Sequence, residues 1–196
     1  MDLKRKVILV TDGDSIAKKT VELAAKNIGA RCISCSAGNP TPIGGEKLVN
    51  MIKSAPHDPV VVMLDDKGYL GSGKGERALE YIYQHPEIEV LGVLAVASNT
   101  EFTTGAHVDA SVTRDSRVVS AGVDKMGWQH SGSDDQVIYG DTVEILNQLN
   151  MPVVIGIGDI GKMDRMDDPQ FGAPVTTMAL KEILNRSGFH DKKGNT

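Results

Sequence analysis

The stretch KVILVTDGD (6–14) runs through four consecutive apolar residues and then directly into carboxylates and glycine. Two later stretches have the same form, VVVMLDD (60–66) and VVIGIGD (153–159). Short, uninterrupted apolar runs are typical of strands that are buried on both faces of a parallel sheet. Because parallel strands end at a common edge of a sheet, we expect the carboxylates of all three stretches to lie along that edge.

Segments with helical periodicity alternate with these strands. Residues 15–28 place Ala17, Val21 and Ala24 on one face, and Gly29 follows as a helix-ending glycine. The same periodicities predict further helices at 48–52, 76–84, 142–149 and 176–186, and further strands at 31–34 and 90–97. The alternation predicts an α/β fold with a Rossmann-like, doubly wound and mostly parallel sheet.

Residues 98–138 break the alternation, because they show no helical period. Two short alternating segments within them, 107–113 and 117–123, predict a β-hairpin excursion. A loop rich in Gly, Ser and Asp follows and carries the only tryptophan, Trp128. Long loops of this kind are often functional, so the excursion is a candidate surface for docking a partner.

Length and composition favour one domain. The 196 residues, 40% of them hydrophobic, are enough for a single well-packed core, so we expect a single α/β domain over 1–196 with a frayed tail at 188–196. The net charge of −5 offers no basic face, which argues against nucleic acid as a partner. The best apolar run, 90–97, is far shorter than the roughly 20 residues that span a bilayer. We therefore expect a soluble protein without a transmembrane segment, which reaches a membrane only through a partner.

The glycine-rich segment 68–75 matches the phosphate-binding pattern G-x-x-x-x-G-K and precedes a predicted helix. Its candidate ligand contacts are Gly71, Gly73 and Lys74. The pattern fails at Gly75, where a Ser or Thr would hold Mg²⁺, and two carboxylates stand directly before the segment. A tight loop between strand and helix is therefore the better interpretation, with some contact to a ligand left open.

A second glycine pattern, GIGDIG (156–161), follows the last predicted strand. A dinucleotide site also requires a helix to begin at once, so that its N-terminus faces the pyrophosphate. An acidic stretch containing Pro169 intervenes here, so we do not expect NAD. Gly158 and Asp159 remain candidate contacts for a small ligand at the sheet edge.

Four aspartates are placed to offer oxygen ligands to a hard cation, with Mg²⁺ or Ca²⁺ as the candidate ions. They are Asp12, Asp14, Asp65 and Asp159, and the first two and the last are also candidate ligand contacts. The alternative is that these side chains cap helices and tie loop amides, since Asp is a favoured N-cap residue.

A Mg²⁺-dependent phosphoryl transferase or hydrolase could use the same four aspartates, with Lys74 or Lys162 contacting the anion. No His or Lys is visibly placed as a general acid or base, so no catalytic residue is assigned. We leave the enzyme question open and favour a non-enzymatic protein.

Several long strings resemble the soluble protein of the stage V sporulation AE family of spore-forming Firmicutes. They are RKVILVTDGD (5–14), RCIS (31–34) with SAGNPTP (36–42), EVLGVLAVASNT (89–100), GDTV (140–143) and VVIGIGDIGKM (153–163). The resemblance covers nearly the whole chain.

The resemblance implies a role in the spore. The family belongs to an operon whose membrane products move dipicolinic acid, with calcium, into the forespore and out again during germination. Its soluble member is expected at the spore inner membrane as a peripheral protein, in contact with proteins of that membrane, and helps germination without an established enzymatic activity. The family supplies no catalytic residue to transfer to this chain.

Overall fold

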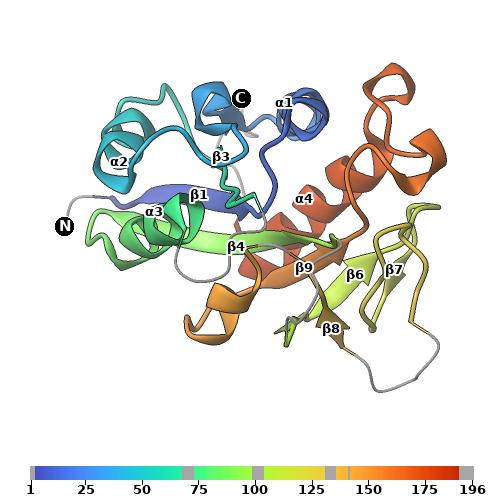
Figure 1. Cartoon of the computed structure of the whole chain (residues 1–196). Helices are drawn as coiled ribbons and strands as arrows, with labels where there is room; N and C mark the ends of the chain where they lie inside the picture. Colours follow the sequence, from blue (N-terminus) through green and yellow to red (C-terminus); the bar gives the residue numbers. More distant parts are fainter. Residues whose placement is uncertain (1–2, 68–72, 99–103, 131–135, 141, 190–196) are drawn as a thin grey trace.

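The computed structural model describes residues 3–67, 73–98, 104–130, 136–140 and 142–189. A seven-stranded sheet forms its centre (Figure 1). In order across the sheet, the strands are β2 (Arg31–Cys32), β3 (Val60–Met63), β1 (Arg5–Val10), β4 (Ile88–Val96), β9 (Val154–Ile157), β6 (Ala110–Val112) and β7 (Val118–Val119). All neighbouring pairs are parallel except β6 and β7. The predicted α/β fold with a mostly parallel sheet is confirmed.

Helices cover both faces of the sheet (Figure 1). Helices α1 (Ser15–Asn27) and α4 (Pro174–Ser187) pack against each other on one face, and α2 (Gly45–Lys53) and α3 (Lys74–Gln84) pack together on the other. The connections also contain the short 3-10 turns η1 (Ser34–Ser36), η2 (Glu144–Asn147), η3 (Met163–Arg165) and η4 (Pro169–Phe171).

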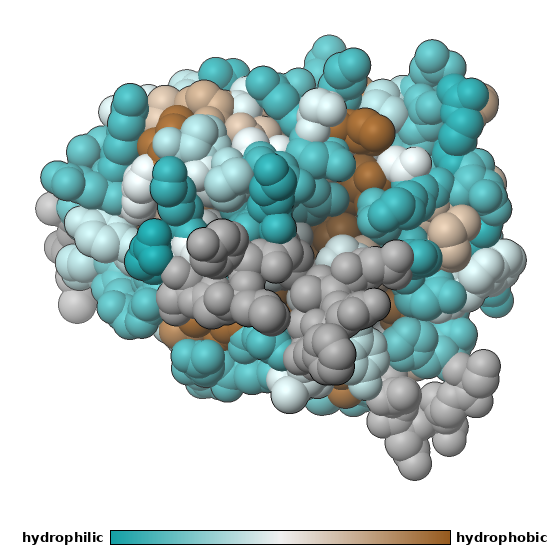
Figure 2. Space-filling model, in the orientation of Figure 1, coloured by the Kyte–Doolittle hydropathy of each residue, from teal (hydrophilic) through white to brown (hydrophobic). Residues whose placement is uncertain are grey.

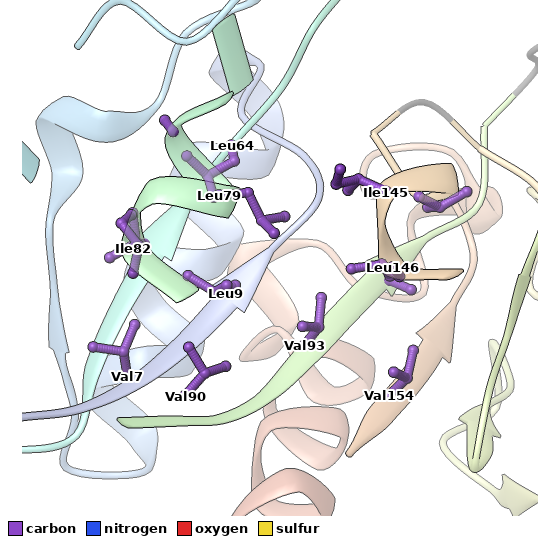
Figure 3. Packing of buried hydrophobic residues seen from close by; sticks show 14 of the residues in the cluster. Val7, Leu9, Leu64, Leu79, Ile82, Val90, Val93, Ile145, Leu146 and Val154 are labelled. Carbon is purple, nitrogen blue, oxygen red and sulfur yellow. The ribbon is translucent and has the colours of Figure 1, made fainter. Parts of the chain in front are cut away.

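Alternate residues of the buried strands face two separate hydrophobic cores. Val7 and Leu9 of β1 lie in the core shared with α2 and α3, whereas Ile8 and Val10 lie in the core shared with α1 and α4. Figure 3 shows the first core, in which Leu79 of α3 lies among the strand side chains. Side chains alternate across a strand, so a strand covered on both faces needs an unbroken apolar run, as found in the sequence.

The strand order reverses next to β1. From β1 the chain crosses to β2 and returns through β3 on one side, and it then continues through β4 to strands on the other side. A ligand crevice in an open α/β sheet forms at such a switch point, outside the carboxyl ends of the strands. The loop that follows β1, which begins with Thr11 and Asp12, lies at that point.

The predicted strand at 107–113 is two strands. Its start belongs to β5 (Ala106–His107), which pairs with β8 (Val137–Ile138) in a small antiparallel sheet. Its later part is β6, which joins the main sheet beside β9 and turns back antiparallel into β7. This second pair is the predicted β-hairpin of the 98–138 excursion, and it is shorter than the segments 107–113 and 117–123 suggested.

The helix predicted at 142–149 is wrong, because the structure has only the 3-10 turn η2 there. Thr142 has φ 59°, in the left-handed region that a β-branched residue rarely adopts and that an α-helix cannot contain. Ile145 and Leu146 still reach the core (Figure 3). The apolar pattern of this segment therefore reflects burial in a short turn.

Three further expectations concern the chain as a whole. Within the ranges described above, no helix combines the length and apolar character needed to cross a membrane. The single domain over 1–196 stays a prediction. Of the predicted tail 188–196, residues 190–196 lie outside the described residues, and Gly188 ends α4 with φ 67°.

Candidate functional site

The loops that follow β1, β3 and β9 bring the predicted aspartates to one edge of the sheet. Asp12 and Asp14 follow β1, Asp65 follows β3, and Asp159 follows β9. The charges of the other three aspartates all act on Asp12, so each of them lies within electrostatic reach of Asp12. The sequence prediction of a shared acidic edge therefore agrees with the structure.

Asp12 occupies the centre of this edge and is partly buried. Loss of hydration on burial, followed by repulsion from Asp14, raises the pKa of Asp12 to about 8. The backbone N–H of Asp14 donates to Asp12 Oδ1 at 3.3 Å and acts in the opposite direction, while the charges of Asp65 and Asp159 raise the pKa further. At neutral pH the side chain of Asp12 is therefore mainly the neutral carboxylic acid.

Asp14 caps helix α1. Its Oδ1 accepts hydrogen bonds from the backbone N–H groups of Ile16 at 2.7 Å and Ala17 at 2.8 Å. These bonds satisfy two amides of the first turn that have no partner inside the helix. The capping alternative raised from the sequence therefore applies to Asp14.

Asp66 fills the N-terminus of α3. Its two oxygens accept hydrogen bonds from the backbone N–H groups of Gly75 at 2.6 Å and Glu76 at 2.8 Å. A Cβ on Gly73 would lie 2.0 Å from Asp66 Oδ1, so only glycine permits this approach. The helix end that binds phosphate in a nucleotide-binding loop is here occupied by a carboxylate of the chain itself.

Asp65 fastens two edge loops together. Its backbone N–H donates to Thr41 Oγ1 and its carbonyl accepts from the Thr41 N–H, both at 2.8 Å. Its Oδ1 accepts a hydrogen bond from the N–H of Lys67 at 2.8 Å. The residue thus has a structural role beside any contact with a ligand.

At the β9 end of the edge, Asp159 pairs with Lys162. Burial nevertheless raises the pKa of Asp159, because its loss of hydration outweighs the attraction of the lysine. The neighbouring Gly158 packs against the excursion, and a Cβ there would lie 2.6 Å from the backbone nitrogen of Gly127. Close packing of two backbones is enough to require glycine at this position.

Two predicted contacts remain, Gly71 and Lys74. Gly71 lies in 68–72, which the structure does not describe. Lys74 begins α3 and lines a cavity between α2 and α3, which the sequence alone did not indicate. In the part of the chain that the structure describes, no group of three or more His, Cys, Asp and Glu residues is arranged to hold a metal ion. The metal site at Asp12, Asp14, Asp65 and Asp159 therefore stays a prediction.

Sequence reasoning missed a buried carboxylate at the start of α4. Asp167 accepts hydrogen bonds from the N–H of Val175 at 2.8 Å and from both the N–H and the hydroxyl of Thr176, at 3.0 and 2.6 Å. Burial raises the pKa of Asp167 despite these bonds. The sequence carried only a weak signal for this cap, because Asp167 lies eight positions before Val175, whose amide it binds, and not at the N-cap position of α4.

Four exposed apolar side chains come from the start of α1, the 98–138 excursion and the segment between β9 and α4. We call them the apolar rim: Ile16, Trp128, Met166 and Phe171, with exposed fractions of 52%, 55%, 43% and 69%. The Arg114 guanidinium lies 4.6 Å from the centre of the Trp128 ring and also pairs with Asp164 at 2.6 Å. Figure 2 shows apolar surface between α1 and residues 160–173.

One comparison with known proteins returned a match. A family model described as stage V sporulation protein AE1 matches residues 6–187. The searches of curated proteins and of solved structures found no match.

Proposed function

The chain belongs to the stage V sporulation protein AE1 family, and on that premise we propose that it is a non-enzymatic accessory protein of spore germination and dipicolinic acid handling. Membership of the family implies a role in sporulation. The match over 6–187 is the single observation that carries the proposal, because it covers every strand of the central sheet except the first residue of β1.

The chemistry of the edge supports a non-enzymatic protein. Asp14 and Asp66 each accept two backbone hydrogen bonds at a helix start, and Asp159 pairs with a lysine. Carboxylates engaged in this way stabilise loops.

We further propose that the chain acts through protein contacts, at the periphery of the spore inner membrane. The apolar rim supplies the contact surface, since exposed aromatic and methionine side chains are enriched at interfaces. Trp128 is the central candidate, because tryptophan and arginine are the residue types that most often dominate binding energy, and Arg114 lies over its ring. The partner would be a protein of the spore inner membrane.

A small ligand or a cation at the acidic edge is a further part of the proposal. The charges of Asp14, Asp65 and Asp159 all disfavour the ionised form of Asp12, and a divalent cation beside them would offset this repulsion and lower the pKa of Asp12. Mg²⁺ and Ca²⁺ are the candidate ions, because both prefer oxygen ligands.

Spores of a strain that lacks this chain provide the test. We expect such spores to release dipicolinic acid more slowly on germination, or to contain less of it, and expect the wild-type chain to restore both quantities. Trp128→Ala should fail to restore them and should lower the fraction of the chain that sediments with inner-membrane fractions.

Leu3→Ala is the control, because Leu3 is 88% exposed and precedes β1, at the end of the sheet opposite the acidic edge. Normal dipicolinic acid content and release without the chain would refute the proposed role. Equal sedimentation of both variants would remove the rim as the contact surface. Enzyme-like turnover of a phosphorylated substrate by the purified chain, abolished by Asp65→Asn, would contradict the non-enzymatic assignment.

A further inference from the structure

A cavity of about 400 Å³ opens between the start of α2 and the first two turns of α3, on the side of the sheet opposite α1 and α4. Its walls include Gly44 and Gly45 from the start of α2 and Lys74, Arg77 and Tyr81 from α3. The volume matches that of sites for small molecules. This cavity is distinct from the acidic edge, because none of the four aspartates at that edge lines it.

The charged side chains among the described residues of the cavity wall are both basic. Lys74 and Arg77 lie three positions apart on α3, so their side chains leave the same face of the helix. Among the described residues that line the cavity, none is acidic. Lys74 forms no ion pair with a carboxylate in the described part of the chain. Two cations in one concave surface favour an anion with two negative charges.

Pro42, Ile43, Gly44 and Gly45 form the opposite wall. A Cβ on Gly44 would meet no atom within 4 Å, so the space beside this residue is open. Gly45 lies against Tyr81, where a Cβ would come within 2.6 Å of the Tyr81 Cβ. This close approach holds the start of α2 against α3, and Tyr81, which is 45% exposed, lines the cavity.

The amides at the start of α3 are not available to a ligand in this cavity. Asp66 already accepts the hydrogen bonds of the Gly75 and Glu76 N–H groups. Recognition of an anion therefore depends on the side chains of Lys74 and Arg77. The guanidinium of Arg77 contributes a permanent, delocalised positive charge, and the ammonium of Lys74 adds a compact charge.

We propose that this cavity binds a small dianion, a dicarboxylate or a phosphate, through Lys74 and Arg77. The ligand lies beside Gly44 and Tyr81, which also line the cavity. The inference stands apart from the proposed function, which supplies only one of the two probes used to test it.

The test is calorimetric titration of the full chain, at low ionic strength and with EDTA present, using inorganic phosphate in one arm and dipicolinate in the other. EDTA removes metal ions that dipicolinate would otherwise chelate, and low salt limits the screening of charge. We expect saturable binding in at least one arm. Lys74→Gln and Arg77→Gln should each weaken it by roughly tenfold or more, since each removes a charged hydrogen bond.

Lys47→Gln is the control for the loss of a positive charge, because Lys47 is an exposed residue of α2 that does not line the cavity. It should change the dissociation constant by less than about threefold, as expected of a charge screened by water.

A second pair of variants keeps the test informative if a lysine or arginine variant folds poorly. Gly44 is the N-cap of α2, with φ −73° and ψ 159°, a conformation open to any residue, and both Asp and Asn are favoured N-caps. Gly44→Asp and Gly44→Asn are equal in size and differ in charge. We expect both to keep or raise the melting temperature, and Gly44→Asp alone to weaken anion binding strongly.

Binding in either arm that falls with Lys74→Gln, Arg77→Gln and Gly44→Asp, and persists with Lys47→Gln and Gly44→Asn, supports the cavity as an anion site. No binding in either arm, or binding that ignores these variants, overturns it. Binding of phosphate but not dipicolinate would support the cavity and leave the proposed function to the spore experiment. A spore defect without any binding would refute the cavity alone.

Discussion

At the level of a single side chain, Asp12 couples stability to pH. Its pKa of about 8 in the folded chain lies well above the unfolded value near 3.8, so the folded state binds the extra proton. The favourable contribution is complete below about pH 4 and is lost as pH rises through about 8. We expect Asp12→Asn, which copies the neutral form, to remove this loss.

Melting temperatures measured between pH 5.5 and 9 would check this prediction. The melting temperature of Asp12→Asn should exceed that of the wild type by a difference that grows with pH, to roughly several degrees at pH 9. One pKa unit corresponds to about 1.4 kcal/mol, and about 1 kcal/mol shifts Tm by about 2–4 °C for a domain of this size. Glu89→Gln, an exposed change, should follow the wild type. Parallel curves for Asp12→Asn and the wild type would contradict the assignment.

Gly73 gives a second prediction from one residue. A methyl group there would overlap Asp66 Oδ1 and separate that carboxylate from the first turn of α3. We expect Gly73→Ala to destabilise the fold by about 2 kcal/mol, the upper end of the cost of a lost cap. Denaturant unfolding would measure it. Gly44→Ala, where the methyl meets no atom within 4 Å, is the control, and an equal loss in both variants would argue against the steric cause.

At the level of a helix, the neighbouring residues Asp167 and Asp168 should differ in how much each stabilises the start of α4. Asp167 is 3% exposed and accepts three hydrogen bonds at the start of α4. Asp168 caps only the short turn η4 and contacts Arg165 near the surface. We expect Asp167→Ala to cost about 2–3 kcal/mol, because buried donors lose their acceptor. Asp168→Ala should cost much less.

Urea unfolding of the two variants would test this contrast, and hydrogen exchange along α4 would locate the loss. Faster exchange in the first turn of α4 is expected for Asp167→Ala alone. Similar stability of the two variants would mean that Asp167 does not anchor the helix.

The sequence predicted those elements that a local pattern determines, and it did not predict those that depend on distant partners. The strands β1, β3, β4 and β9 were predictable because burial on both faces requires unbroken apolar runs. The division of 107–113 between two sheets was not, since it depends on distant partners, β8 and β9. At the edge, the sequence could place Asp14 and Asp66 after strands. For Asp14 the sequence left helix capping and ligand binding as alternatives. The cap formed by Asp66 gave no local signal, since its partners Gly75 and Glu76 lie nine and ten positions later.

For the whole molecule, a cation at the acidic edge would appear as added stability. A ligand at 100 times its Kd contributes about 2.7 kcal/mol, several degrees in a domain of this size. We expect Ca²⁺ or Mg²⁺ to raise Tm relative to EDTA, and Asp65→Asn to abolish the rise. Potassium chloride at equal ionic strength and the exposed variant Asp115→Asn serve as controls. An unchanged Tm in both ions would exclude tight binding.

The position of Asp66 has a consequence for competition with free ions. A carboxylate tethered to the amides of α3 by the same chain acts at an effective concentration of about millimolar or more, and its bonds to Gly75 and Glu76 are already formed. A dissolved phosphate would have to displace the Asp66 carboxylate before it could bind these amides. The helix end that a nucleotide-binding loop would offer to phosphate is therefore already occupied by Asp66. Replacing Asp66 with a neutral residue would make the amides of this helix end available to anions in solution.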